Sequence, residues 1–186
     1  MTSILKADTI QDTDGNNIIN ESGNTITIGA SGDTTNIIGT LQNNGAAVGG
    51  ANTPAFHVYL SGNQSISSST AVKVNFDSET FDTDNAFASN KFTVPTGEGG
   101  KYFFHAHIRK GTNNDNLNLV YIYVNGNSKG YFRRQAKAQN AYQITQILDL
   151  SAGDYVEVYV YDDGGSASIL ANADNYTYFT GYKLIT

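Results

Sequence analysis

The sequence predicts an all-β protein, a jelly-roll sandwich that carries a β-rich stem at its N-terminus. Short segments of alternating apolar and polar residues recur through the second part of the chain, with turn residues between them. No segment shows a sustained 3.6-residue period with capping residues, so helices are not expected. All 12 Tyr and 9 Phe lie in residues 51–186, and residues 1–50 contain none. We therefore expect two domains, a stem over 1–50 and a sandwich over 51–186.

The predicted strands of the second domain follow from period-two alternation. They cover residues 73–76, 101–108, 117–124, 143–148, 154–161 and 176–185. Turn signals separate several of them, namely Asn125-Gly126, residues 151–154 and residues 162–165. Many short antiparallel strands at regular spacing are typical of a sandwich or a jelly roll.

The first fifty residues contain a weak glycine-led repeat. Units beginning at Gly15, Gly23 and Gly32 each place a turn residue before a short β-branched stretch, as a rung of a β-prism or β-helix requires. One such chain has too few apolar side chains to bury its own faces. The segment is either disordered alone or ordered within a trimer that buries a stem core of isoleucines. These are Ile18, Ile26, Ile28 and Ile37.

Composition limits the classes of partner. The chain has 17 acidic and 11 basic residues, a net charge of −6, which argues against sequence-independent binding of nucleic acid. It has no Cys, so disulfides, zinc knuckles and thiol nucleophiles are excluded. No apolar run approaches the ~20 residues of a membrane helix, and no secretory signal is recognised. We expect a protein that does not insert into a membrane and is assembled in the cytoplasm.

Catalytic motifs are also missing from the sequence. The chain has three His and neither a Gly-x-Ser-x-Gly elbow nor a phosphate loop. A carboxylate pair for glycoside hydrolysis stays open, because geometry rather than spacing defines it. We predict a non-enzymatic protein without a cofactor.

Seven motifs follow one another along residues 54–186. They are Pro54-Ala-Phe56, residues 74–77, residues 90–95, residues 100–107, the hairpin 124–126, residues 150–156 and Phe179-Thr-Gly181-Tyr182. In this order they resemble the C1q-like domains of the C1q/TNF superfamily. The resemblance implies a ten-stranded jelly roll that forms a trimer through one sheet. It further implies binding of partners through the outer surface and loops, and a recognition module rather than an enzyme.

The N-terminus departs from animal members, since it shows neither a signal nor a collagen repeat. Its opening, residues 3–10 and onward, instead resembles tail-fibre and other virion proteins of marine bacteriophages. The two resemblances imply a homotrimeric phage fibre in the virion. Its stem would dock on other virion proteins, and its knob would adsorb to a glycan or protein of the host surface. The alternative is a capsid decoration or cement protein at a threefold site.

Two clusters are candidate sites. His105 and His107 share one face of a predicted strand, and a threefold axis would bring six imidazoles together. The sequence favours a strand in which the histidines face a neighbouring subunit or solvent over a metal site, with the core lined by Tyr102, Phe104, Ala106 and Ile108. A basic and aromatic cluster is the candidate receptor contact, because its cations and rings suit an anionic glycan. It consists of Lys129, Tyr131, Phe132, Arg133, Arg134, Lys137 and Tyr142. A solvated loop or an inter-subunit salt bridge is the competing interpretation of this cluster.

Overall fold

The structure, a computed structural model, describes residues 38–39, 41–43, 46–47, 52–67, 69–111, 117–135, 141–164, 167–171 and 176–184. The chain divides into two units, Met1–Val48 and Gly49–Thr186. In the first unit the described residues include a small antiparallel pair, β1 (Gln42–Asn43) and β2 (Ala46–Ala47). The four predicted stem-core isoleucines, Ile18, Ile26, Ile28 and Ile37, lie outside the described residues.

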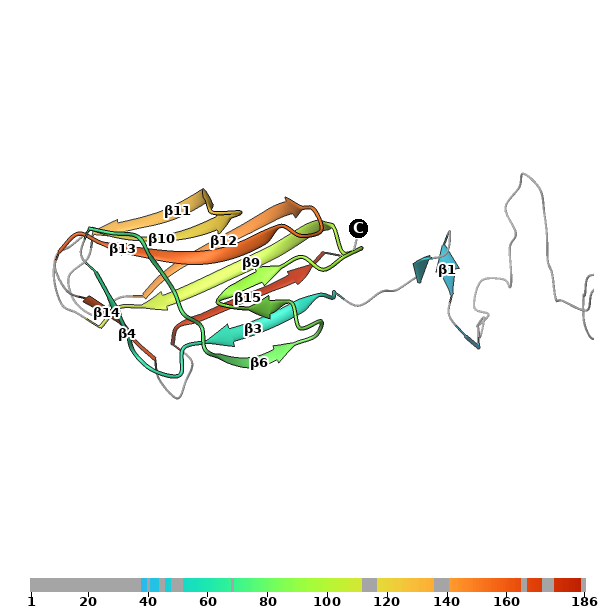
Figure 1. The fold of residues 1–186 in the computed structure, drawn as a ribbon, viewed down its shortest axis with the longest axis horizontal. Helices are drawn as coiled ribbons and strands as arrows, with labels where there is room; N and C mark the ends of the chain where they lie inside the picture. Colours follow the sequence, from blue (N-terminus) through green and yellow to red (C-terminus); the bar gives the residue numbers. More distant parts are fainter. Residues whose placement is uncertain are drawn as a thin grey trace, which may run out of the picture. The chain divides into compact units, whose positions relative to one another are not determined.

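The second unit is a sandwich of two antiparallel sheets, which Figure 1 shows as two layers. The larger sheet has the order β11-β10-β13-β8-β7, with β5 also paired to β13. Its strands are β5 (Val72–Lys73), β7 (Phe87–Ala88), β8 (Lys91–Thr93), β10 (Leu117–Val124), β11 (Asn127–Gln135) and β13 (Tyr155–Asp162). In this order β11 is an edge strand, paired on one side to β10.

The second sheet has five strands in the order β12-β9-β15-β3-β6. They are β3 (Ala55–Tyr59), β6 (Ser78–Asp82), β9 (Gly100–Arg109), β12 (Ala141–Leu150) and β15 (Tyr178–Lys183). A third, two-stranded sheet pairs β4 (Gln64–Ile66) with β14 (Ala167–Ile169). The described residues form strands, turns and loops and no helix, so no membrane-crossing helix is found among them. The all-β sandwich predicted from the sequence is confirmed.

Alternation along each strand separates a buried face from an outer face. In β9, Tyr102, Phe104, Ala106 and Ile108 are buried, as the sequence predicted, while His105 and His107 point outward. In β10 and β13 the buried hydrophobic residues are β-branched, whereas the outward ones are largely tyrosines. The core between the sheets is therefore aromatic on the five-stranded side and mostly valine and isoleucine on the six-stranded side.

One ion pair is enclosed within the described part of the sandwich. The ammonium of Lys110, at the end of β9, contacts the carboxylate of Asp162 at the end of β13, and both side chains are at most 2% exposed. Removing one partner of such a buried pair leaves an uncompensated charge, which typically costs ~3–5 kcal/mol. Because Lys110 follows β9 of the five-stranded sheet and Asp162 ends β13 of the six-stranded sheet, the pair connects the two sheets at this end.

The hairpin between β10 and β11 has the geometry that its sequence predicts. Asn125 and Gly126 both have positive φ, 51° and 75°, as a two-residue hairpin turn of the primed type requires. The Asn125 side chain also donates from Nδ2 to Oδ1 of Asp154 at 2.7 Å, and its Oδ1 accepts from the backbone N–H of Tyr155 at 3.0 Å. The turn is thereby attached to the start of β13.

Candidate binding surfaces

The outward side of the six-stranded sheet carries a continuous group of tyrosines. We call it the tyrosine face, and it comprises Tyr121, Tyr123, Tyr131, Tyr155, Tyr159 and Tyr161. Cross-strand register places Tyr121 between Tyr131 of β11 and Tyr159 of β13. Half of the chain's 12 tyrosines therefore lie on three adjacent strands.

The rings of the tyrosine face contact one another. Tyr123 and Tyr159 stack with centroids 4.4 Å apart. Tyr121 meets Tyr131 at 5.7 Å, and meets Tyr123 edge-on at the same separation. Burial raises the pKa of Tyr121, and the nearby phenols of Tyr123, Tyr161 and Tyr131 raise it further. The Tyr121 phenol therefore stays neutral and can donate a hydrogen bond at physiological pH.

Cations border this face. Arg133 pairs with Leu119 in the outward register of β11, and Lys129 occupies a β-bulge opposite Tyr123; both are exposed. Lys91 lies over the ring of Tyr155, 4.4 Å from its centroid. Lys73 is already engaged, because its Nζ lies 2.7 Å from Oε1 of the buried Glu157. Positive charge thus gathers on one face of an acidic protein.

The structure divides the receptor-contact cluster predicted from the sequence. The cluster lies largely on strand β11 rather than in a loop, and alternation sends Tyr131 and Arg133 to the tyrosine face but Phe132 and Arg134 to the opposite side. Lys129 is the extra residue of the bulge beside Tyr123, and its charge acts on Asp154, which directly precedes Tyr155. Lys137 lies outside the described residues.

Tyr142 does not belong to an exposed contact surface. It is 4% exposed, since it pairs with the buried Ile108 in the inward register of β12. The prediction that Tyr142 belongs to the receptor-contact cluster is wrong, because residues that are close in the sequence do not all lie on one surface. Conversely, five of the tyrosines on the face, all on β10 and β13, escaped the sequence grouping although their period-two spacing was visible.

The outward side of the five-stranded sheet differs in chemistry. His57, His105 and His107 surround Tyr178, with ring centroids 5.2, 5.7 and 5.4 Å from that ring. Exposed apolar side chains extend the surface, with Phe81 47% and Ile147 62% exposed. We call this group of six residues the histidine face.

Each of the two β9 histidines has one ring nitrogen engaged. Nδ1 of His107 donates to the carbonyl oxygen of Tyr176 at 2.6 Å, and Nδ1 of His105 lies 2.8 Å from Oγ1 of Thr145. Burial lowers the pKa of His105, and the charge of His107 lowers it further; burial also lowers the pKa of His57. No group of three metal-ligating side chains occurs within the described ranges, so His105 and His107 remain a two-nitrogen pair.

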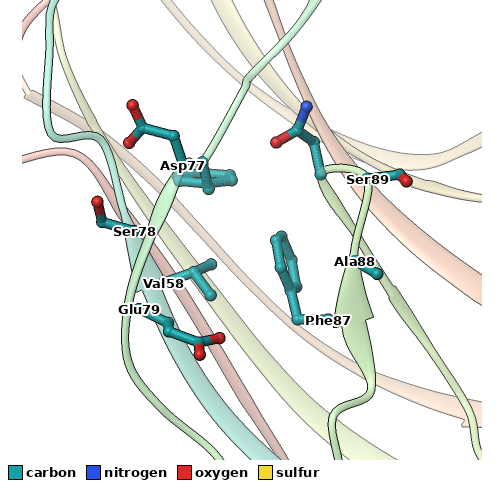
Figure 2. A pocket seen from close by; sticks show the side chains of 9 residues that line it. Val58, Asp77, Ser78, Glu79, Phe87, Ala88 and Ser89 are labelled. Carbon is teal, nitrogen blue, oxygen red and sulfur yellow. The ribbon is translucent and has the colours of Figure 1, made fainter.

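A third feature is a shallow hollow of roughly 280 Å³ between the segment 76–79 and the β7–β8 hairpin. Figure 2 shows Val58 and Phe87 directed into it, with Asp77 turned away. The Asp77 carboxylate accepts hydrogen bonds from N–H and Oγ–H of Ser61, at 2.7 and 2.8 Å. Because the Asp77 carboxylate is engaged in holding the loop at Ser61, it is not directed at a ligand in the hollow.

The fold and the sequence agree with one known family. Residues 55–184 match the C1q domain, which covers more than half of the chain. The chain belongs to the C1q domain family. Homotrimers are typical of the C1q/TNF group, and its members are non-enzymatic ligand-binding or structural proteins.

Solved structures show the same fold at low sequence identity. The globular domain of zebrafish complement 1qA is 17% identical with a TM-score of 0.52, and the alignment covers 72% of this chain and 98% of that one. Eiger TNF from S. frugiperda is 15% identical with a TM-score of 0.53, covering 70% and 92%. Murine APRIL is 16% identical with a TM-score of 0.52, covering 70% and 98%. No curated protein sequence matches the chain.

The terminal C1q-like motif Phe179-Thr-Gly181-Tyr182 has a packing explanation. A Cβ on Gly181 would lie 2.6 Å from Cδ1 of Phe104 and 2.9 Å from Cε1 of Phe56. Glycine is thus required where β15 crosses the stacked aromatic rings of the core. The motif is therefore explained by packing in the core of this C1q domain and not by a ligand site.

Proposed function

We propose that this C1q domain protein is a homotrimeric phage fibre, in which residues 1–50 dock on the virion and the sandwich domain adsorbs to the host surface. The observation that carries the trimer is the histidine face. It combines aromatic and aliphatic side chains on the outward side of the five-stranded sheet, and exposed apolar surface of this kind is typical of a protein–protein interface.

The charges around the histidine face support the same assignment. Among the described residues, the carboxylate on the outward side of β12 is Asp149, and it pairs with Lys101 at 3.4 Å near one end of the sheet. Arg109, at the other end of β9, stacks on Tyr176 at 4.6 Å. Asp149, Lys101 and Arg109 thus lie toward the ends of the face, and a copy of the same chain can cover its centre without burying any of these three charges unpaired.

The stem and the virion role are supported by the sequence. The glycine-led repeat of residues 1–50 and its likeness to virion proteins favour a stem that becomes ordered by winding three chains together. Adsorption through three equivalent knobs would multiply weak single contacts. The decoration-protein alternative shares the trimer and differs in the position of the protein on the particle.

The test is the molar mass of the full-length protein in solution, by light scattering after size exclusion. We expect three times the chain mass of 20.0 kDa at pH 7.5. A monomer would overturn the proposal. Antibody labelling of intact particles would then separate a fibre from a capsid decoration.

A further inference from the structure

We infer that the tyrosine face is a binding site for an acidic polysaccharide, whose sugar rings stack on the tyrosines and whose carboxylates pair with Arg133 and Lys129. This assignment deepens the proposed function, on which it rests, by naming the surface of the knob and the class of ligand that it takes.

Packing alone does not account for the tyrosines. Valine and isoleucine side chains fill the inward register of β10 and β13, where Val120, Ile122 and Val158 are at most 1% exposed. The outward register of these strands and of β11 has no such core to fill, yet it holds six tyrosines, and Tyr131 is 60% exposed. Tyrosine offers an apolar ring and a polar tip, which is the combination enriched where a surface meets a partner in water.

The geometry suits a chain of sugars. The rings run without interruption from β11 across β10 to β13, a distance of about 10 Å from the spacing of adjacent strands. Ring faces contact the C–H side of a sugar, while the phenol hydroxyls exchange hydrogen bonds with its hydroxyl groups. Since Tyr121 and its neighbours support one another by stacked and edge-on contacts, little side-chain ordering is needed on binding.

Charge complementarity selects an acidic glycan over a neutral one. Arg133 and Lys129 are exposed beside the rings. The neighbouring carboxylates are occupied, because Glu157 pairs with Lys73. The Asp154 carboxylate accepts hydrogen bonds from the Asn125 side chain at 2.7 Å and from the Ser151 backbone N–H at 2.8 Å. Positive charge therefore faces an approaching carboxylate, whereas the net charge of −6 opposes a dense polyanion such as a nucleic acid.

The test uses the full-length protein and two probes in calorimetric titrations, an oligogalacturonate of about ten units and an isomalto-oligosaccharide of equal length. We expect the uronate to bind and the neutral glucan to bind at least tenfold more weakly. Tyr131→Ala should weaken uronate binding roughly three- to tenfold, from the usual energy of an aromatic contact. Tyr131→Phe should retain most of it, because the ring stays.

Charge variants complete the test. Arg133→Gln should weaken binding and reduce its dependence on salt, whereas Lys101→Gln, an exposed cation on the other sheet, is the matched control and should change neither. Absence of uronate binding by an intact trimer would overturn this inference and leave the proposed trimer standing. Equal losses in the Arg133 and Lys101 variants, or indifference to Tyr131→Ala, would also overturn it, as would equal binding of the glucan. If the wild type is a monomer, the proposed trimer is contradicted instead. The molar mass shows this independently of glycan binding.

Discussion

The outward surfaces of the two sheets are both aromatic, and their difference lies in what accompanies the rings. On the histidine face the rings lie among imidazoles, Phe81 and Ile147, with formal charge kept to its ends. On the tyrosine face the rings carry hydroxyl groups and are bordered by Arg133 and Lys129. The first chemistry suits removal from water, and the second suits contact with a hydrated, charged ligand. In the two proposals above, one sheet of this C1q domain serves assembly and the other serves recognition.

The largest effect should come from a charge on the histidine face. Ile147→Asp places a carboxylate in the surface that we assign to the trimer, where burying it unpaired costs several kcal/mol. We expect the molar mass to fall from trimer to monomer at micromolar concentration. The matched substitution on the other sheet, Tyr131→Asp, should leave the trimer intact. If both variants stay trimeric, the two faces do not differ as proposed.

The inward surfaces of the two sheets offer a second contrast, through two glycines. Gly181→Ala forces a methyl group against Phe104 and Phe56 and should destabilise the fold by about 1–3 kcal/mol, as overpacking does. A Cβ on Gly130 would meet the side chain of Gln146 at 1.9 Å, but that amide is the flexible end of a long side chain and can rotate away. Gly130→Ala should therefore change stability by less than about 1 kcal/mol. Urea unfolding of both variants provides the comparison.

Acid should act on the histidine face before it acts on the tyrosine face. The pKa values of His57 and His105 lie below the ordinary 6.5, so the folded protein binds fewer protons than the unfolded chain. Stability is then fully present above pH 6.5 and falls as the pH drops from there toward the folded pKa values. We expect a loss of order 1 kcal/mol or less, since half-exposed imidazoles are screened by solvent.

Thermal unfolding between pH 7.5 and 5.5 measures this loss. The double variant His57→Gln, His105→Gln should unfold with a flatter dependence on pH. A wild type whose melting temperature rises on acidification would contradict the lowered pKa values. Because unfolding of a trimer depends on protein concentration, both proteins are compared at the same concentration.

The smallest effect is expected at the exposed pair of Lys101 and Asp149. Their side chains are 56% and 71% exposed and 3.4 Å apart, and pairs of this kind contribute little. Lys101→Gln should shift the free energy of unfolding by less than about 0.5 kcal/mol. A larger loss would show that this end of the histidine face is covered by another chain, which would extend the proposed interface.

Much of the fold was predictable from local alternation. Alternation predicts the strand 117–124 with its observed ends, and it predicts each inward residue of β9. It does so because successive side chains of a half-buried strand point alternately to the core and to the outside. Strand β11 was missed as a strand, since Gly130 and two adjacent arginines interrupt its alternation. Its stability comes from pairing with β10, a tertiary property that a single segment does not display.

The sequence predicts that a basic and aromatic surface exists near β11, but it does not predict which residues form that surface. Residues near Tyr131 and Arg133 were grouped by sequence proximity, but a strand sends neighbours to opposite sides, which separates Phe132 and Arg134 from them. The tyrosines of β10 and β13 join the face through strand pairing across about forty residues, and no local pattern reports that register.

Strand β11 borders the larger sheet, and its outer margin is a row of backbone groups that could pair with a strand of another molecule. Lys129, Arg133 and Arg134 lie along it and would bring like charges together if two copies met margin to margin. These cations thereby oppose edge-to-edge pairing of sandwich domains, a hazard that grows when many copies are held at high local density. Neutralising these cations should first appear as lost solubility, well before any change in the folded domain itself.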